Sequence, residues 1–171
     1  MPNDILKLIK DYPDFPKSGV LFKDILPILQ EPNIFKDLVD RMSTSEIFRD
    51  TVAILSIDAR GFIFGTAIAL RLSKPMVVAR KLGKLPGELL YKSYDLEYGQ
   101  STLSIQKSAI KDYQSFVVVD DLLATGGTVK CVSAILRESE KEIRGLAVVI
   151  ELSQFNAKES LPFPVESQII C

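Results

Sequence analysis

Histidine and tryptophan are absent from this chain of 171 residues, and cysteine occurs only twice. Without histidine, a Ser-His-Asp or Cys-His nucleophile, a zinc site built on imidazole and histidine acid/base catalysis are all excluded. Catalysis must then depend on carboxylates, cations, tyrosine or main-chain groups. Cys131 and Cys171 are far apart in the sequence, so neither a disulfide framework nor a CxxC metal pair is indicated, and a reducing cytoplasm fits best.

An excess of charge of one sign and long hydrophobic runs are also missing. The 22 acidic and 21 basic residues nearly balance, whereas a general nucleic-acid binder needs a basic face. No apolar run approaches the roughly 18 residues of a membrane span. The first residues, MPNDILKLIK, alternate charge with aliphatic side chains, unlike a signal peptide. We therefore expect a cytoplasmic protein with no nucleic-acid or membrane partner.

The chain contains no internal repeat, low-complexity tract or Gly/Ser-rich linker. Its length suits one ordinary domain, and 47% of its residues are hydrophobic, which is enough for one shared core. We therefore expect residues 1–171 to form a single domain.

Strand-like and helix-like patterns alternate along the sequence. Nearly continuous apolar runs, typical of parallel strands covered on both faces, occur at residues 52–57, 76–79, 116–119 and 146–150. Helical patterns occur at residues 4–11, 33–42, 62–72 and 128–141. This alternation predicts an α/β fold with a doubly wound, mostly parallel sheet.

Two segments depart from this alternation. Residues 82–109 are rich in Gly, Tyr and charge and include short alternating stretches that suggest a hairpin, so we expect a lid there. Residues 15–27, FPKSGVLFKDILP, predict a short strand over one end of the sheet, although simple structural wrapping explains them equally well.

The most informative stretch is FVVVDDLLATGGT, residues 116–128. A buried strand ends in Asp120 and Asp121, and a Gly-containing turn then leads into a helix. Main-chain NH groups at the start of a helix lack helical partners and attract a phosphate. The two carboxylates could accept hydrogen bonds from sugar hydroxyls. The stretch therefore predicts a sugar-phosphate site whose cradle is Ala124, Thr125, Gly126, Gly127 and Thr128.

Other interpretations of this stretch are weaker. A bare Asp-Asp pair more often ends a strand and caps a helix, but the strand-turn-helix context favours a phosphate site. A Walker A loop is excluded because GxxxxGK[ST] does not occur, and the GxGxxG dinucleotide fingerprint is also missing.

VVVDDLLATGGT resembles the diphosphoribosyl-binding motif of the type I phosphoribosyltransferases. Three more segments resemble members of that family that act on adenine: FPKSGVLFKDILP, DARGFIFG and RKLGKLPGELLYKSYDLEYG. They occur in the family's order over roughly the first three quarters of the chain. One departure is Ser18, which stands where the family usually has Pro before the Gly.

The resemblance implies transfer of a phosphoribosyl group from 5-phosphoribosyl 1-diphosphate to adenine, giving AMP and diphosphate in purine salvage. It implies the type I fold with a small N-terminal and lid hood, a homodimer, and Mg²⁺ carried largely by the diphosphoribosyl substrate, so no metal-ligating residue is expected. Left open are another base as acceptor and a non-catalytic regulator that keeps the fold.

The resemblance also assigns roles to individual residues. Arg60 is a catalytic cation near the diphosphate, Glu97 the acid/base group at the purine, and Tyr98 its organising neighbour. A lone Arg after a strand is usually a surface salt bridge, and a Glu beside a Tyr in a loop is usually solvated. The remaining expected ligand contacts, beside the cradle and the aspartates, are Arg80, Lys81, Lys84, Leu21, Phe22, Lys23 and Leu152.

Overall fold

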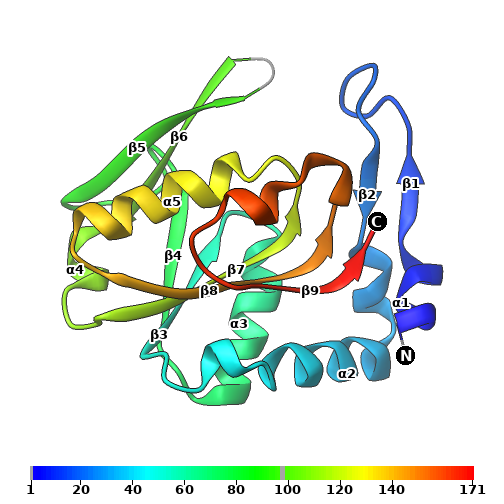
Figure 1. Cartoon of the computed structure of the whole chain (residues 1–171), viewed down its shortest axis with the longest axis horizontal. Helices are drawn as coiled ribbons and strands as arrows, with labels where there is room; N and C mark the ends of the chain where they lie inside the picture. Colours follow the sequence, from blue (N-terminus) through cyan, green and yellow to red (C-terminus); the bar gives the residue numbers. More distant parts are fainter. Residues whose placement is uncertain (1, 97–98) are drawn as a thin grey trace.

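The structure is a computed structural model that describes residues 2–96 and 99–171. Helices and strands alternate along the chain (Figure 1). The α-helices and strands are α1 (Pro2–Leu8), β1 (Lys10–Tyr12), β2 (Phe22–Asp24), α2 (Pro32–Ser43), β3 (Ala53–Ile57), α3 (Gly61–Leu72), β4 (Met76–Lys81), β5 (Leu89–Leu96), β6 (Gly99–Gln106), α4 (Lys107–Ile110), β7 (Ser115–Leu123), α5 (Gly127–Glu138), β8 (Glu142–Glu151) and β9 (Val165–Ile170). Short 3-10 helices are η1 (Leu26–Gln30), η2 (Glu46–Phe48), η3 (Ser153–Phe155) and η4 (Ala157–Ser160). Every helix in these described ranges is too short or too polar to be a membrane span.

A seven-stranded sheet organises the molecule, in the order β5-β6-β4-β3-β7-β8-β9. Strands β4, β3, β7, β8 and β9 are parallel, and β6 and β5 extend the sheet as an antiparallel edge. The central strands β3 and β7 lie side by side, so their carboxyl ends meet at one edge, where open α/β sheets bind ligands. The predicted α/β, mostly parallel sheet is confirmed.

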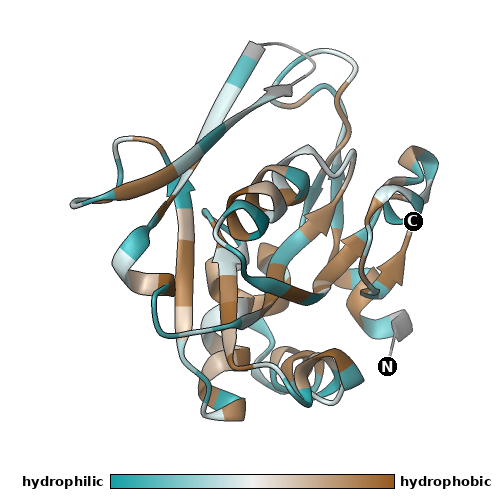
Figure 2. Cartoon of the chain, turned by 60° about the vertical axis from the view of Figure 1, so that its left-hand side comes forward, coloured by the Kyte–Doolittle hydropathy of each residue, from teal (hydrophilic) through white to brown (hydrophobic). Residues whose placement is uncertain are grey.

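Apolar side chains fill both faces of the sheet. One buried cluster joins Leu55 and Val118 to α5, while the other joins Ile54 and Val119 to α2 and α3. Successive residues of a strand therefore enter opposite clusters, which explains why these strands are apolar without alternation. Figure 2 shows hydrophobic colour concentrated on the central strands, and Figure 1 shows α5 on one side of them and α3 on the other.

The predicted elements match with local differences. The first helix is shorter than predicted and gives way to β1, and α5 ends at Glu138 rather than at Lys141. Strand β9 (VESQII) was not predicted because only Val165 and Ile169 are buried, a weak apolar pattern in a short edge strand.

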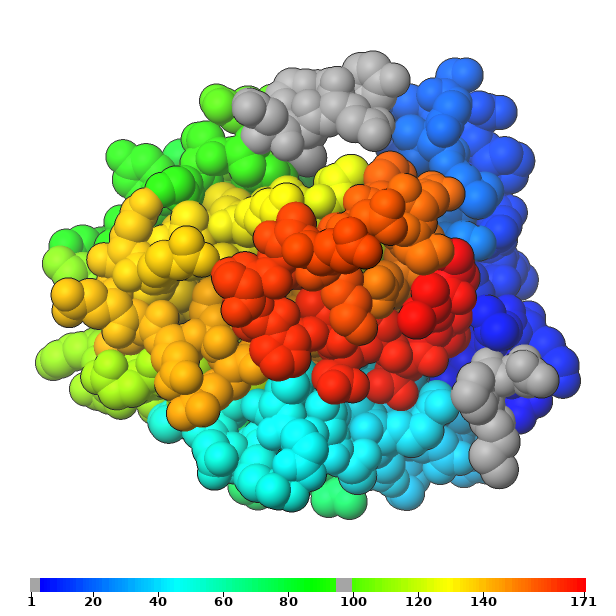
Figure 3. Space-filling model, in the orientation of Figure 1, coloured from blue at the N-terminus to red at the C-terminus, as the bar shows by residue number. Residues whose placement is uncertain are grey.

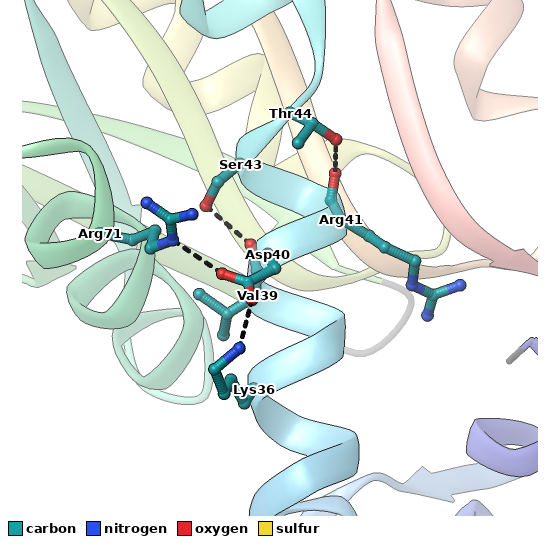
Figure 4. A network of polar contacts seen from close by, with 7 residues as sticks. All are labelled: Lys36, Val39, Asp40, Arg41, Ser43, Thr44 and Arg71. Atoms are coloured by element: carbon teal, nitrogen blue, oxygen red, sulfur yellow. Dashed lines mark hydrogen bonds and ion pairs between the residues drawn. The ribbon is translucent and has the colours of Figure 1, made fainter.

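Helices α2 and α3 are joined by a polar contact on their exposed side (Figure 4). Asp40 accepts hydrogen bonds from Lys36 Nζ at 2.8 Å and from Arg71 Nε at 2.7 Å. These two cations hold the pKa of the Asp40 carboxyl below its usual value. Since Lys36 shares α2 with Asp40 and Arg71 belongs to α3, the network orients one helix against the other.

Two glycines bring α3 close to the central strands. A Cβ at Gly65 would lie 2.3 Å from Ser56 Oγ on β3, and a Cβ at Gly61 would lie 2.8 Å from Asp120 Oδ1 on β7. No larger residue fits at either position without movement. The start of α3 thus lies directly against the first aspartate of the pair.

The two segments that depart from the alternation of strands and helices lie on either side of the carboxyl edge of the sheet. Residues 82–109 contain the β5–β6 hairpin, attached to the sheet through the β4–β6 pairs. Residues 15–27 contain β2, which pairs with β1 as a separate antiparallel ribbon. Both predictions, a hairpin and a short strand, are confirmed, and the two segments rise on opposite sides of the sheet edge (Figure 1).

Candidate functional site

A cavity of about 390 Å³ lies where β7 passes into α5. Strand β7 ends at Leu123, and α5 begins after Gly126, whose φ of 80° is the left-handed conformation that glycine adopts readily. No side chain caps this helix start, so its first main-chain NH groups remain available to a ligand. All the predicted cradle residues, from Ala124 to Thr128, line the cavity.

Asp120 and Asp121 line the same cavity, although they are only 8% and 6% exposed. The main-chain NH of Asp121 donates to Asp120 Oδ1 at 2.8 Å. Burial, and then the neighbouring Asp121 carboxylate, raise the pKa of Asp120 well above its usual range, and Arg60 only partly opposes this. The pair is therefore a costly concentration of negative charge that a ligand's hydroxyl donors would relieve.

Arg60 connects this pair to the neighbouring segment. Its Nε lies 2.8 Å from Asp121 Oδ2, but that buried oxygen accepts no hydrogen bond of good geometry within the described structure. The same guanidinium donates from Nη1 to the Lys23 carbonyl at 3.1 Å and lies over the Phe22 ring, 4.8 Å from its centroid. Arg60 thus pairs with Asp121 and links the two carboxylates to the β2 segment.

A second cavity of about 690 Å³ adjoins the first and shares Arg60, Leu122, Ala124 and Thr125 with it. The predicted base-site residues Leu21, Phe22, Lys23 and Leu152 all line it. Its walls come from the β2 segment and from the segment after β8, which meet on the face shown in Figure 3 in blue and orange. A cavity of this size, with Phe22 and Leu152 among its lining residues, suits a flat aromatic ligand.

Of the other predicted ligand-binding cations near the diphosphate, only one lines either of the two cavities. Lys81 lines the first cavity, whereas Arg80 and Lys84 line neither of these two cavities. Arg80 Nε instead donates to Asp58 Oδ2 at 3.0 Å, and its guanidinium lies 5.8 Å from the Phe62 ring centroid. Contact of Arg80 and Lys84 with a ligand therefore stays a prediction.

The predicted catalytic residues Glu97 and Tyr98 lie outside the residues that the structure describes. Their roles at a bound base stay predictions.

Sequence reasoning missed several residues of the site. Tyr94 and Leu103, from the hairpin, and Asp58 line the first cavity, and Gln154 and Phe155 line the second. The alternation of strand β5 was a usable signal for Tyr94, since it places this residue on the same inward face as Leu90. No comparable pattern marks the segment after β8.

No group of three or more Asp, Glu, Cys or His side chains that could hold a metal ion occurs among residues 2–96 and 99–171. The only carboxylates that line the first cavity within those ranges are Asp58, Asp120 and Asp121, and Asp58 is paired with Arg80. A hard cation there would need most of its oxygen ligands from a substrate and from water.

Comparison with known proteins gives a consistent result. The family described as "Phosphoribosyl transferase domain" matches residues 27–166. An adenine phosphoribosyltransferase of Prochlorococcus marinus (strain MIT 9211) is 65% identical over 99% of both chains. Among solved structures, adenine phosphoribosyltransferase from Thermoanaerobacter pseudethanolicus has a TM-score of 0.94 at 35% identity over 100% of both chains. The Saccharomyces cerevisiae enzyme, complexed with D-2,5-dideoxy-2,5-imino-altritol 1,6-bisphosphate and adenine, has a TM-score of 0.90 at 34% identity over 98% of this chain and 97% of that one. The chain belongs to the phosphoribosyl transferase domain family, and within it to the adenine phosphoribosyltransferases.

Proposed function

We propose that the protein transfers the phosphoribosyl group of 5-phosphoribosyl 1-diphosphate to adenine, giving AMP and diphosphate. The observation that carries this proposal is the adjacency of two cavities. One contains a cradle of free main-chain NH groups and two buried carboxylates, and the other is lined by Phe22 and Leu152. A sugar phosphate fits the first and a flat base the second, with Arg60 between them.

In the first cavity the start of α5 would bind the 5-phosphate of the substrate. Asp120 and Asp121, which both line this cavity, would accept hydrogen bonds from the ribose hydroxyls. The reaction gathers positive charge on the ribose ring, which two nearby carboxylates stabilise more in the transition state than in the ground state. The two aspartates accept hydrogen bonds from the hydroxyls and stabilise positive charge electrostatically, and they do not act as bases.

The leaving diphosphate gains negative charge, so cations at its oxygens lower the barrier. Arg60 and Lys81 already line the first cavity, and we include Arg80 and Lys84 in the same role. Mg²⁺ would arrive with the diphosphate and supply further neutralisation of that charge. Asp120 and Asp121, which line the first cavity, are oxygen donors of the kind that Mg²⁺ accepts beside phosphate and water.

The purine must lose a proton when its nitrogen attacks. We assign that proton to Glu97, with Tyr98 organising the site, because the segment YDLEYG resembles the family's active-site loop and the chain has no histidine for this role. The main-chain groups of Leu21 and Lys23 would select adenine. The 6-amino group of adenine needs a hydrogen-bond acceptor, such as a main-chain carbonyl, whereas a 6-oxo purine needs a donor, such as a main-chain NH, at the same place.

Three broader features complete the proposal. We infer a single domain and a homodimer, for which the outward side of α3 offers apolar surface: Leu70 is 81% exposed and Phe62 is half-buried. A cytoplasmic location agrees with two free cysteines and no membrane span in the described helices. Mass measurement in solution tests the dimer.

The function is tested by incubating the purified protein with 5-phosphoribosyl 1-diphosphate, Mg²⁺ and each of several bases at one fixed concentration. We expect AMP from adenine and far less product from hypoxanthine, guanine, xanthine or pyrimidines. Faster turnover of another base would reassign the acceptor. No product with any base, together with tight and salt-sensitive binding of DNA or RNA, would favour a non-catalytic regulator.

A further inference from the structure

Tyr94 contributes a polar group to the first cavity that the proposed chemistry does not use. Its half-buried ring packs, together with Leu90, against the core cluster that contains Val129 and Val132 of α5. Its hydroxyl lies 3.4 Å from Thr128 Oγ1, which donates toward it. A side chain of the β5–β6 hairpin thus reaches the first turn of the helix that forms the cradle.

The contact between these two hydroxyls is weak. Its length exceeds the roughly 2.7–2.8 Å usual for O–H···O hydrogen bonds, so both groups keep capacity for a further partner. The main-chain NH of Thr128 belongs to the first turn of α5 and lacks a helical acceptor. A phenol can donate to a phosphate oxygen without adding negative charge to a cavity that already contains Asp120 and Asp121.

Two other contacts align the hairpin with α5. Cys131 Sγ donates to the Lys92 carbonyl at 3.1 Å, and Lys92 Nζ pairs with Glu138. Strand β5 is therefore tied to the middle and the end of α5 through Lys92, and Tyr94 makes the contact at the ligand end. Figure 1 shows the hairpin beside this helix, and in the sequence Glu97 follows Tyr94 by three residues.

We propose that the Tyr94 hydroxyl is a ligand of the phosphate group bound at the start of α5, and that this phosphate in turn holds β5 against the site. The inference rests on the proposed function, in which the phosphate is the 5-phosphate of the substrate.

The test is Tyr94→Phe, which keeps the ring and removes only the hydroxyl. Ribose 5-phosphate binding, measured by calorimetry without any turnover, should weaken about 10- to 100-fold, as expected for one hydrogen bond to a charged group. The KM for 5-phosphoribosyl 1-diphosphate should rise by a similar factor, while the KM for adenine stays within about twofold. Tyr91→Phe is the matched control, because Tyr91 lies on the same strand and is 64% exposed.

Three outcomes would overturn the proposal. Unchanged ribose 5-phosphate affinity in Tyr94→Phe would show that the hydroxyl is not a ligand. Equal loss in Tyr91→Phe, or a parallel rise in the KM for both substrates with a lower melting temperature, would indicate a purely structural role. A wild-type protein that binds ribose 5-phosphate but makes no AMP would refute the proposed function alone, because the binding comparison would still decide the role of Tyr94.

Discussion

Replacing Asp120 by Asn should make the protein more stable and less functional. The substitution keeps the shape of the side chain and an oxygen for the Asp121 main-chain NH, which now donates to Asp120 Oδ1 at 2.8 Å. It removes a carboxylate that is buried, beside a second carboxylate, and against the start of α3 at Gly61. We expect a gain of about 1–2 kcal/mol at neutral pH, typical of relieving a functional site of a destabilising group. This corresponds to roughly 2–4 °C in melting temperature per kcal/mol for a chain of this size.

The gain should depend on pH in a defined direction. Burial and the neighbouring Asp121 raise the pKa of Asp120 in the folded protein, so the folded state keeps a proton that the unfolded chain releases above its ordinary pKa of 3.8. The stabilisation linked to that proton is fully present below pH 3.8, and it is lost as the pH rises through the pKa of Asp120 in the folded protein. The advantage of Asp120→Asn should therefore be small near pH 4 and grow toward pH 8.

Urea unfolding of both proteins between pH 4 and pH 8 measures this difference. Asp112→Asn is the control, since Asp112 is exposed and should shift stability little at any pH. An Asp120→Asn variant that is destabilised, or whose advantage does not change with pH, would refute the account of a strained buried pair. The same variant should raise the KM for 5-phosphoribosyl 1-diphosphate.

Two further substitutions test other parts of the structure. Glu97→Gln should lower kcat about 10²-fold or more while ribose 5-phosphate affinity stays unchanged, as expected for lost acid/base catalysis, and unchanged turnover would remove this assignment. Gly65→Ala should cost about 1–3 kcal/mol by overpacking, because its Cβ would lie 2.3 Å from Ser56 Oγ. In thermal unfolding, the double variant Gly65→Ala, Ser56→Gly should regain stability relative to Gly65→Ala. Thr66→Ala, on the exposed side of α3, should have little effect. A Gly65→Ala variant as stable as wild type would contradict this packing.

Much of the fold was predictable because the central strands are covered on both faces. Strands such as β3 and β7 contain nearly continuous apolar runs, which are a strong signal in a short sequence window. Edge elements lack this signal: β9 buries only part of its surface, and the three residues of β1 are all exposed. Their positions depend on neighbours that are distant in the sequence.

The candidate site was predictable to the extent that one local segment forms it. The cradle and the two aspartates come from a single strand-turn-helix, so the sequence order fixes their proximity. Tyr94 and Phe155 reach the site through the tertiary arrangement of the hairpin and of the segment after β8. The base site was located by family resemblance, because Phe22 and Leu152 look like core residues in the sequence.

A crystal structure of the protein with ribose 5-phosphate would show directly whether the start of α5 binds the phosphate. The account predicts the phosphate on the main-chain NH groups of Thr125 to Thr128, with the ribose hydroxyls donating to Asp120 and Asp121. A phosphate bound elsewhere, or ribose hydroxyls that contact neither carboxylate, would contradict it.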